Sequence, residues 1–189
     1  MAIAVETKHL LLRPFTDADV DLVVELDSDP EVMRYLTGGV ATPRAAVVDS
    51  VLPRFRSWDD LDPFGYAAAH ERSSGAFVGW FAIHPADRTA SVDIELGYRL
   101  RRAAWGHGYA TEGSIALVDR AFTAPEVERV WAQTMAVNTA SRQVMRRAGL
   151  RYVRTFHPAW LHALPGAEAG EVTYAVTRCE RTRAEVHEG

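Results

Sequence analysis

The stretch Leu100-Arg101-Arg102-Ala103-Ala104-Trp105-Gly106-His107-Gly108-Tyr109-Ala110-Thr111-Glu112 joins a strand-like segment to a helical one. Backbone N–H groups at the start of a helix have no partner within it, and the helix macrodipole adds positive potential there. The small residues let a ligand approach this backbone closely, so the loop predicts a cradle for a pyrophosphate group. The alternative is a glycine-rich turn that holds no ligand.

Two nucleotide-binding motifs do not fit this loop. No Gly-Lys-Ser or Gly-Lys-Thr of a Walker loop occurs, and Gly106-x-Gly108 followed by Ala110 is not the dinucleotide motif GxGxxG. A nucleotide-binding protein stays an alternative, and it predicts protection by ATP or NAD.

Before the loop, turn residues and apolar periodicity predict a strand, two helices and three strands. The first helix has a capped start at Thr16–Asp19, and the second is opened by Thr42-Pro43. The expected ranges are a strand at 9–14, helices beginning at 16 and spanning 45–55, and strands at 64–70, 77–84 and 91–100.

In the last of these strands, Asp93 and Glu95 face one way and Ile94 and Leu96 the other, and Gly97 predicts a bulge or a close backbone approach.

After the loop we expect a helix at 111–122, a strand at 127–137, a short helix capped by Asn138, and strands at 151–156 and 171–178. Gly149 stands where a left-handed residue ends a helix. The order β-α-α-β-β-β-α-β-α-β-β predicts an α/β protein of the α+β type around a mostly antiparallel sheet of about seven strands with about four helices.

Composition predicts one soluble domain over residues 1–189, with a frayed charged tail at 179–189. The longest apolar runs are too short for a bilayer, and the start lacks a signal-peptide pattern, so we expect a cytoplasmic protein. A formal net charge of -4 argues against a nucleic-acid partner. The single cysteine, Cys179, and seven histidines without HxxxH or HxH spacing favour no metal site.

Several motifs, in order, resemble the GNAT superfamily of N-acetyltransferases. Its acetyl-CoA motif (Q/R)xxGx(G/A) would read Trp105-x-x-Gly108-x-Ala110, with Trp105 in place of Gln or Arg. Trp-Gly-x-Gly-Tyr-Ala-Thr-Glu resembles the RimJ/RimL-like branch, whose named members acetylate ribosomal-protein N-termini. Further likenesses, from about residue 8 to 178, are Leu12-Arg13-Pro14-Phe15, Ile94-Glu95-Leu96-Gly97-Tyr98, Asn138-x-x-Ser141 and Arg147-Ala148-Gly149-Leu150.

The resemblance implies that acetyl-CoA lies where two strands splay after a bulge near Gly97. The pantetheine arm would pair with the backbone of Tyr98, Arg99 and Leu100. Asn138 and Ser141 would lie beside the pantetheine and the sulfur, although Asn138 can also serve only as a helix cap. The pyrophosphate would meet the amides of Gly106, His107, Gly108, Tyr109, Ala110 and Thr111. His107, Arg142 and Arg146 would neutralise phosphates or form a solvated face.

The implied reaction needs a neutral amine, so a base is useful at neutral pH. Glu95 is the preferred base, and Asp93 is the second choice; the alternative for Glu95 is a surface carboxylate. Many superfamily members carry a tyrosine acid seven residues after the asparagine, where this chain has Met145. Ser141 is the remaining donor to sulfur, unless the thiolate takes its proton from solvent. Cys179 lies far from these motifs, so we expect direct transfer in a ternary complex.

The resemblance favours a peptide or protein α-amine as acceptor, with amino sugars, polyamines, antibiotics and other small amines as alternatives. Trp58 and Trp160 would line the acceptor pocket or only pack in loops, and Asp59, Asp60 and Asp62 would attract a cationic amine or stay solvated. The rival from another class is a non-catalytic acyl-CoA-binding module. We expect a monomer or homodimer that binds no membrane.

Overall fold

The computed structural model describes residues 4–58, 60–61, 63–85, 92–159 and 164–182. Within these ranges eight strands form one sheet in the order β1-β2-β3-β4-β5-β6-β8-β7. Neighbouring strands are antiparallel except β5 and β6, which are parallel, so the predicted mixed and mostly antiparallel sheet is confirmed. The strands are β1 (Val5–Glu6), β2 (Leu10–Pro14), β3 (Gly65–Glu71), β4 (Phe77–Pro85), β5 (Asp93–Leu100), β6 (Arg129–Met135), β7 (Arg151–Phe156) and β8 (Glu171–Thr177).

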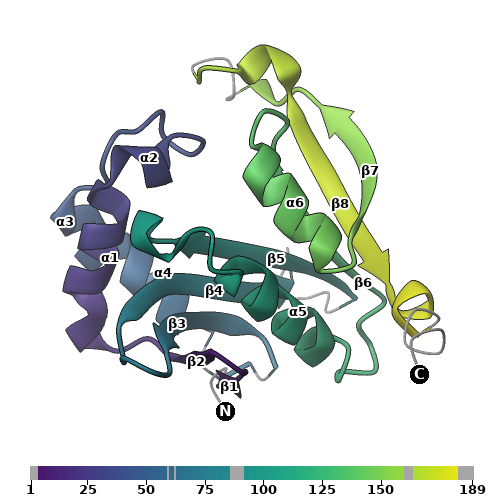
Figure 1. Ribbon diagram of the computed structural model, residues 1–189, viewed down its shortest axis with the longest axis horizontal. Helices are drawn as coiled ribbons and strands as arrows, with labels where there is room; N and C mark the ends of the chain where they lie inside the picture. The colour runs from purple at the N-terminus through teal and green to yellow at the C-terminus, as the bar shows by residue number, and fades with distance from the viewer. Residues whose placement is uncertain (1–3, 59, 62, 86–91, 160–163, 183–189) are drawn as a thin grey trace.

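Helices cover both faces of this sheet (Figure 1). Helix α5 packs on β4 and β5 and helix α6 on β6 and β7, whereas α1 packs on β4 and α4 on β3. The α-helices are α1 (Val20–Ser28), α2 (Pro30–Met33), α3 (Arg44–Ala46), α4 (Leu52–Arg56), α5 (Tyr109–Ala121) and α6 (Thr139–Arg147).

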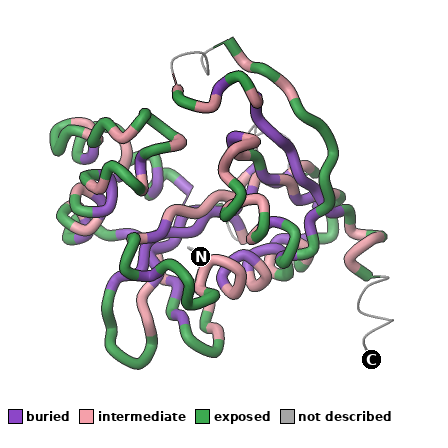
Figure 2. The backbone as a smooth tube through the Cα atoms, turned by 45° about the horizontal axis from the view of Figure 1, so that its top comes forward, coloured by how far each residue is buried: buried purple, intermediate pink, exposed green. Residues whose placement is uncertain are grey.

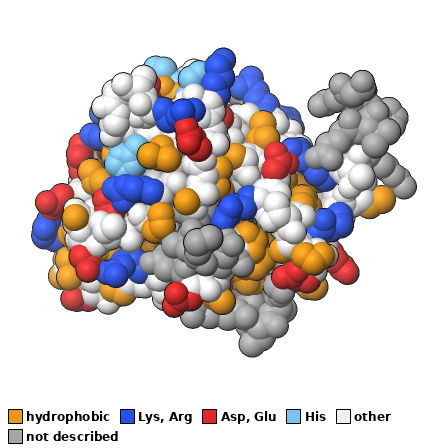
Figure 3. Space-filling view, turned by 90° about the horizontal axis from the view of Figure 1, so that it is seen from below, with side chains coloured by type: hydrophobic (Ala, Val, Ile, Leu, Met, Phe, Trp, Pro, Cys, Tyr) orange, Lys and Arg blue, Asp and Glu red, His pale blue; other side chains and the backbone are white. Residues whose placement is uncertain are grey.

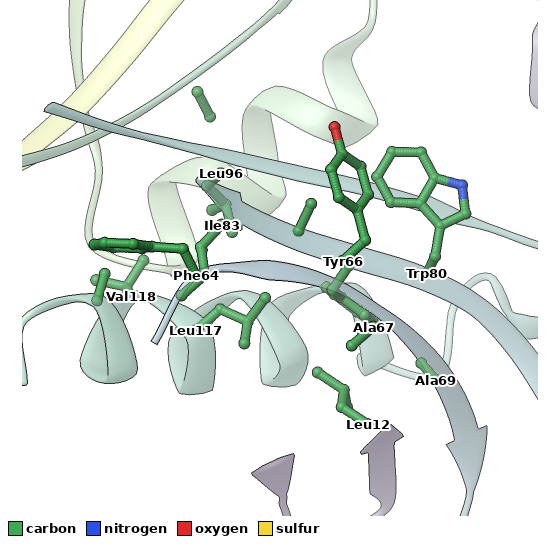
Figure 4. Packing of buried hydrophobic residues seen from close by; sticks show 14 of the residues in the cluster. Leu12, Phe64, Tyr66, Ala67, Ala69, Trp80, Ile83, Leu96, Leu117 and Val118 are labelled. Carbon is green, nitrogen blue, oxygen red and sulfur yellow. The ribbon is translucent and has the colours of Figure 1, made fainter. Parts of the chain in front are cut away.

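The core lies mainly between β2–β5 and helix α5, because alternate strand residues there are apolar. Figure 4 shows Leu117 and Val118 of α5 below the sheet, while Tyr66 and Trp80 point to the opposite face. On that opposite face the ring of Phe55 from α4 stacks on Tyr66 with centroids 4.3 Å apart. Both faces of the central strands are therefore buried, as Figure 2 shows for β3 and β4.

The predicted helix at 45–55 is present but contains a π-helical turn at Val47–Val51 between α3 and α4. Pro53 stands two residues after this turn and has no N–H group for a regular helical bond to residue 49. At Leu52 the N–H group instead bonds the carbonyl of Val47, five residues earlier. The wider turn accommodates the proline without ending the helix.

The sheet divides where β5 meets β6. These strands pair only at Asp93–Glu95 with Arg129–Trp131, and residues 96–100 of β5 then have no partner on that side. Figure 1 shows β6, β8 and α6 diverging from β4 and β5 beyond this point. The expected splay is therefore present, but β5 pairs with β4 without a register shift at Gly97, so the bulge predicted there is absent from that pairing.

The outer parts of the molecule are more open. Strand β7 is exposed along nearly its whole length (Figure 2), and residues 178–182 are helical. The remainder of the tail predicted to fray, 183–189, lies outside the described residues. Figure 3 shows charged side chains of both signs interspersed on the face seen from below.

Candidate active site

The glycine loop places unpaired amides at the start of α5. Gly106 and Gly108 have φ angles of 80° and 83°, and Gly108 is the N-cap of α5 without a side-chain cap. The first helical bond runs from the Glu112 N–H to the Gly108 carbonyl. The N–H groups of Tyr109, Ala110 and Thr111 thus have no partner within the helix. A Cβ atom at Gly106 or Gly108 would meet nothing within 4 Å, so this backbone is open to a ligand.

Trp105, which replaces the usual Gln or Arg, fastens the loop to the strand before it. Its indole Nε1 donates to the Leu100 carbonyl at 3.0 Å. The other side of the loop is held by Tyr109, whose hydroxyl donates to Glu71, and by the His107 ring, which stacks on Tyr109 with centroids 5.5 Å apart. The loop is therefore positioned before any ligand arrives.

A cavity of about 440 Å³ runs from this loop to the start of α6. The predicted cofactor residues that line it are Tyr98, Leu100, Gly106, Gly108, Tyr109, Ala110, Thr111, Asn138 and Ser141. Two predicted residues are not in its lining: the Arg99 side chain pairs with Asp27 on the opposite face, and His107 is exposed. Arg147 also lines the cavity, although the motif that contains it was not assigned to the cofactor.

The backbone of β5 offers hydrogen-bonding groups to this cavity. Backbone groups of successive residues in a strand point to opposite sides. The Arg101 N–H bonds the Val78 carbonyl on the β4 side, and the Val92 carbonyl accepts from the β6 side. By alternation the backbone groups of Tyr98 point to the side that β6 has left. An extended ligand arm could pair there as an added strand would.

The first turn of α6 closes the cavity, and Asn138 fixes this turn. Its Oδ1 accepts from the Ser141 N–H at 3.2 Å, and its Nδ2 donates to Thr134 Oγ1 at 3.1 Å. Both ends of this amide therefore have protein partners, as the capping interpretation requires.

Tyr98 reaches the same turn from β5. Its hydroxyl lies 2.9 Å from Ser141 Oγ and 3.1 Å from the Ser141 carbonyl oxygen. Burial raises the pKa of Tyr98 to about 12, against the opposing effect of its bond to Ser141, so the phenol stays protonated at neutral pH. Met145, at the family's tyrosine position, is 1% exposed. Tyr98 and Ser141 thus bring two hydroxyl groups together at this end of the cavity.

Glu95 lies on the opposite face of the sheet, beside the point where β5 and β6 separate. Burial raises the pKa of Glu95, the negative charge of Glu171 raises it further, and Arg54 opposes the shift. A carboxylate with a raised pKa is a better base near neutral pH. Asp93, the second candidate for the base, accepts hydrogen bonds from Arg129 at both carboxylate oxygens, at 2.8 Å and 2.9 Å.

Aromatic side chains form a wall next to Glu95. His84 is the Cα partner of Glu95 across β4 and β5, and its Nε2 lies 2.9 Å from the Tyr66 hydroxyl. Its Nδ1 lies 3.1 Å from the Pro85 carbonyl, which can only accept, so Nδ1 carries the proton and Nε2 accepts from Tyr66. Burial lowers the pKa of His84 and keeps the ring neutral. Trp58 stacks on His84 with ring centroids 4.9 Å apart, and its role in an acceptor pocket stays a prediction.

Other predicted residues lie elsewhere or outside the described ranges. Arg142 donates to the Ala136 carbonyl at 2.9 Å and, with Arg146, lines a separate hollow of about 910 Å³. Asp60 is exposed, and so is Cys179. Asp59, Asp62 and Trp160 lie outside the described residues.

A small apolar cluster bridges the open end of the split sheet. Tyr35, beyond α2, packs with Val137 and Leu164 against Met135 and Ala167. The segment after α2 and the segment before β8 thereby pack against the same two residues.

Neither a metal site nor a membrane span is found in the described part of the chain. Over those residues, no three His, Cys, Asp or Glu side chains are grouped so that they could hold a metal ion. Among the described helices, none combines the length and the apolar character that crossing a bilayer requires.

Comparisons with known proteins agree with this geometry. Residues 9–151 match the family model described as the acetyltransferase (GNAT) domain. The chain is 32% identical over 192 residues to the FsC-acetyl coenzyme A-N(2)-transacetylase of Aspergillus fumigatus. This alignment covers 94% of this chain and 77% of that protein.

Solved structures show the same fold at lower identity. A GNAT-family acetyltransferase from Bacillus anthracis superposes with a TM-score of 0.75 at 22% identity, over 93% of this chain and 98% of that one. The aminoglycoside acetyltransferase AAC(6')-Ib, in complex with coenzyme A and kanamycin, gives a TM-score of 0.72 at 18% identity, over 93% and 99%. The sequence matches decide between the alternatives left open above: the chain belongs to the GNAT family and is an N-acetyltransferase with acetyl-CoA as its cosubstrate.

Proposed function

We propose that this enzyme, a single domain over residues 1–189, transfers the acetyl group of acetyl-CoA to the primary amine of a small molecule. The observation that carries the acceptor class is the relative at 32% identity, which spans 94% of this chain and is named an N(2)-transacetylase of FsC. The packing of Tyr35 and Leu164 against one apolar cluster supports it, because this packing brings the segment after α2 to the segment before β8. An extended peptide would need an open groove there.

A peptide or protein α-amine is the second candidate. The loop Trp105–Glu112 and the Asn138-x-x-Ser141 turn favour it, because both resemble the RimJ/RimL-like branch. An α-amine and a small aliphatic amine pose the same chemical problem, since both are largely protonated at neutral pH. The two candidates therefore differ in acceptor binding and share the reaction below.

In the proposed reaction acetyl-CoA binds in the cavity with its pyrophosphate on the amides of Tyr109, Ala110 and Thr111. Glu95 takes one proton from the acceptor ammonium and later releases it to solvent. The neutral nitrogen attacks the thioester carbonyl carbon, the C–S bond breaks, and the second proton lost by nitrogen ends on the sulfur. Ser141 donates a hydrogen bond to the sulfur as negative charge develops there, and Tyr98 donates to Ser141 and positions it.

The test is acetyl transfer to a panel of spermidine, kanamycin, benzylamine and peptides with free N-termini, followed by thiol release. We expect turnover of a small amine, and Glu95→Gln to lower kcat about 100-fold with little change in acetyl-CoA binding. The matched control is Asp93→Asn on the same strand face, whose carboxylate is committed to Arg129.

Turnover of peptides alone would establish the second candidate instead. Turnover of no amine would contradict the proposal. Equal kcat values for Glu95→Gln and Asp93→Asn would contradict the assignment of Glu95 as the general base.

A further inference from the structure

Glu171, the first residue of β8, is a buried residue whose carboxylate has no partner in the described part of the chain. It is 6% exposed, and its burial raises the pKa of its carboxyl group. Among the described residues no hydrogen bond or ion pair to this carboxylate is found. A buried carboxylate without a partner destabilises a fold. The position therefore calls for a functional explanation.

Strand register places Glu171 on the same face as Glu95. Glu95 is the Cα partner of Trp131 on β6, and Trp131 is the partner of Ala175 on β8. Side chains alternate along a strand, so Ala175, Thr173 and Glu171 point to the face that carries Glu95. The two carboxylates are close enough for the charge of Glu171 to act on Glu95. Glu95 thus lies at the point where β5 leaves β6, and Glu171 lies on the same face across β6, beside Met135.

Thr173 adds an independent observation on this face. It is 8% exposed, and its Oγ1 is buried with no hydrogen-bond partner among the described residues. Thr173 follows Glu171 by two residues on β8, so both side chains point to the same face. The face thus carries the buried Thr173 hydroxyl and the Glu171 carboxylate on β8, and the half-buried Glu95 carboxylate on β5, with β6 between the two strands. Unpaired buried polar groups cost free energy unless a ligand satisfies them.

The surrounding charged groups do not neutralise the two carboxylates. Arg54 from α4 lies over the Tyr66 ring, 5.9 Å from its centroid, and is exposed. His84 from β4 is neutral, and Tyr66 from β3 donates to it. Arg154 from β7 is the Cα partner of Thr173, and its guanidinium lies over Phe156. Within the described ranges, none of these groups is within ion-pair distance of Glu95 or Glu171.

We propose that Glu95 and Glu171 together bind the ammonium group of a cationic amine acceptor, with the Thr173 hydroxyl as a further hydrogen-bonding partner. An ammonium group carries three N–H donors and one positive charge. It satisfies both carboxylates at once and relieves their repulsion. The inference rests on the proposed function and narrows its acceptor class to amines that are protonated in solution.

The pair also fits the first step of the reaction. Two neighbouring carboxylates titrate together, and one of them holds a proton more readily because the other is negative. When the ammonium gives one N–H proton to Glu95, the Glu171 carboxylate stabilises the protonated form. Glu171 acts through Glu95 and through the bound ammonium, so it is a positioning and acceptor-binding residue.

The experiment compares Glu171→Gln with Glu168→Gln. The two variants lose the same charge three positions apart, but Glu168 is exposed. Benzylamine, an ammonium at neutral pH, and O-benzylhydroxylamine, neutral there, are titrated calorimetrically into the wild-type enzyme saturated with CoA and into both variants. We expect Glu171→Gln to weaken benzylamine binding about tenfold, to leave O-benzylhydroxylamine within about twofold, and Glu168→Gln to change neither.

Two further readouts separate binding from a structural role. Glu171→Gln should melt at the wild-type temperature or above it, because it removes a buried charge. It should also move the acidic limb of kcat/KM for the amine acceptor to lower pH, because the pKa of Glu95 falls when the Glu171 charge is removed.

Equal benzylamine affinities for Glu171→Gln and Glu168→Gln would overturn the inference. So would a wild-type enzyme that does not prefer benzylamine to O-benzylhydroxylamine, or a Glu171→Gln enzyme that melts lower and keeps its pH profile. These outcomes leave the proposed function intact. Absence of acetyl transfer to every panel amine contradicts the proposed function itself.

Discussion

At the scale of single residues, the hydroxyl group that many relatives carry at the position of Met145 is replaced by one from another element. The sequence has Met145 where many relatives have a tyrosine, and Met145 is buried in the core. Tyr98 on β5 supplies a hydroxyl group instead, and this hydroxyl lies 2.9 Å from Ser141 Oγ. We expect this pair to serve as the hydrogen-bond donor to the departing sulfur.

Asp19 supports a prediction about stability. It accepts two hydrogen bonds from Arg13, at 2.7 Å and 2.8 Å, and one from the Thr16 N–H at 2.7 Å. Burial alone would raise the pKa of Asp19, but these bonds outweigh burial and lower it to about 2. Asp19→Asn should therefore reduce the free energy of unfolding by roughly 2 kcal/mol at neutral pH, measured by urea denaturation.

The sign of the pH dependence follows from the lowered pKa. The stabilisation by Asp19 is present above its unfolded-state pKa of 3.8 and is lost as the pH falls toward about 2. The difference between wild type and variant should shrink over that window. Asp21→Asn is the control, since Asp21 pairs with Arg44 in solvent and its side chain is 79% exposed. A loss at Asp21 as large as that at Asp19 would contradict the account.

Sequence-based prediction of single residues succeeded where the interactions of a residue are local in the chain. Asn138 caps α6 as predicted, and Gly149 has a φ angle of 91°. It failed for Glu171 and Arg147, whose surroundings are set by strands and helices distant in sequence. The alternation in β8 sets Glu171 opposite the apolar Val172 and Tyr174 and therefore predicts an exposed side chain, and only the pairing through β6 places it on the face of Glu95.

At the scale of elements, helix α5 is held to the sheet by a close contact at Gly113. A Cβ atom there would lie 2.4 Å from Cζ of Phe81. Alanine in place of glycine favours a helix by about 1 kcal/mol, whereas overpacking a core costs about 1–3 kcal/mol. We expect Gly113→Ala to lower the free energy of unfolding by about 1 kcal/mol and the melting temperature with it.

A double-mutant cycle identifies the cause. Phe81→Leu alone should also destabilise the protein because Phe81 is fully buried. In the Phe81→Leu background, Gly113→Ala should cost less than in the wild type, since the ring is gone. Additive losses would show that contact with Phe81 is not responsible.

Element prediction depended on how much of the pattern was local. Strands β3, β4 and β7 and helix α5 lie within about two residues of their expected ranges, since alternation and helical periodicity mark them. The two-residue strand β1 and the four-residue helix α2 were not predicted. Both elements are too short to produce a recognisable period of apolar residues in the sequence. The π turn before Pro53 is a consequence of the missing proline N–H group. The apolar periodicity used to predict the helix does not indicate such a turn.

At the scale of the whole molecule, the sheet is two parts joined at β5 and β6 by three residue pairs. A pantetheine arm along residues 98–100 would add contacts where this junction ends. Since a ligand that binds only the folded state stabilises it, CoA at about 100 times its Kd should add about 2.7 kcal/mol. We expect a rise of several degrees in the melting temperature, followed by calorimetry.

ATP is the control, because it carries adenine and phosphates without a pantetheine arm. The same rise with ATP as with CoA would show that the nucleotide alone accounts for binding.

The cofactor cradle is tested most directly by the affinity for CoA of two matched glycine variants. Gly108 and Gly75 have φ angles of 83° and 71°, and a Cβ at either would meet nothing within 4 Å. Gly108 begins α5 at the cavity, whereas Gly75 lies in the turn between β3 and β4. Calorimetric titration should show CoA binding weakened about tenfold by Gly108→Ala and within about twofold of wild type for Gly75→Ala. Equal affinities for the two variants would contradict the placement of acetyl-CoA on this loop.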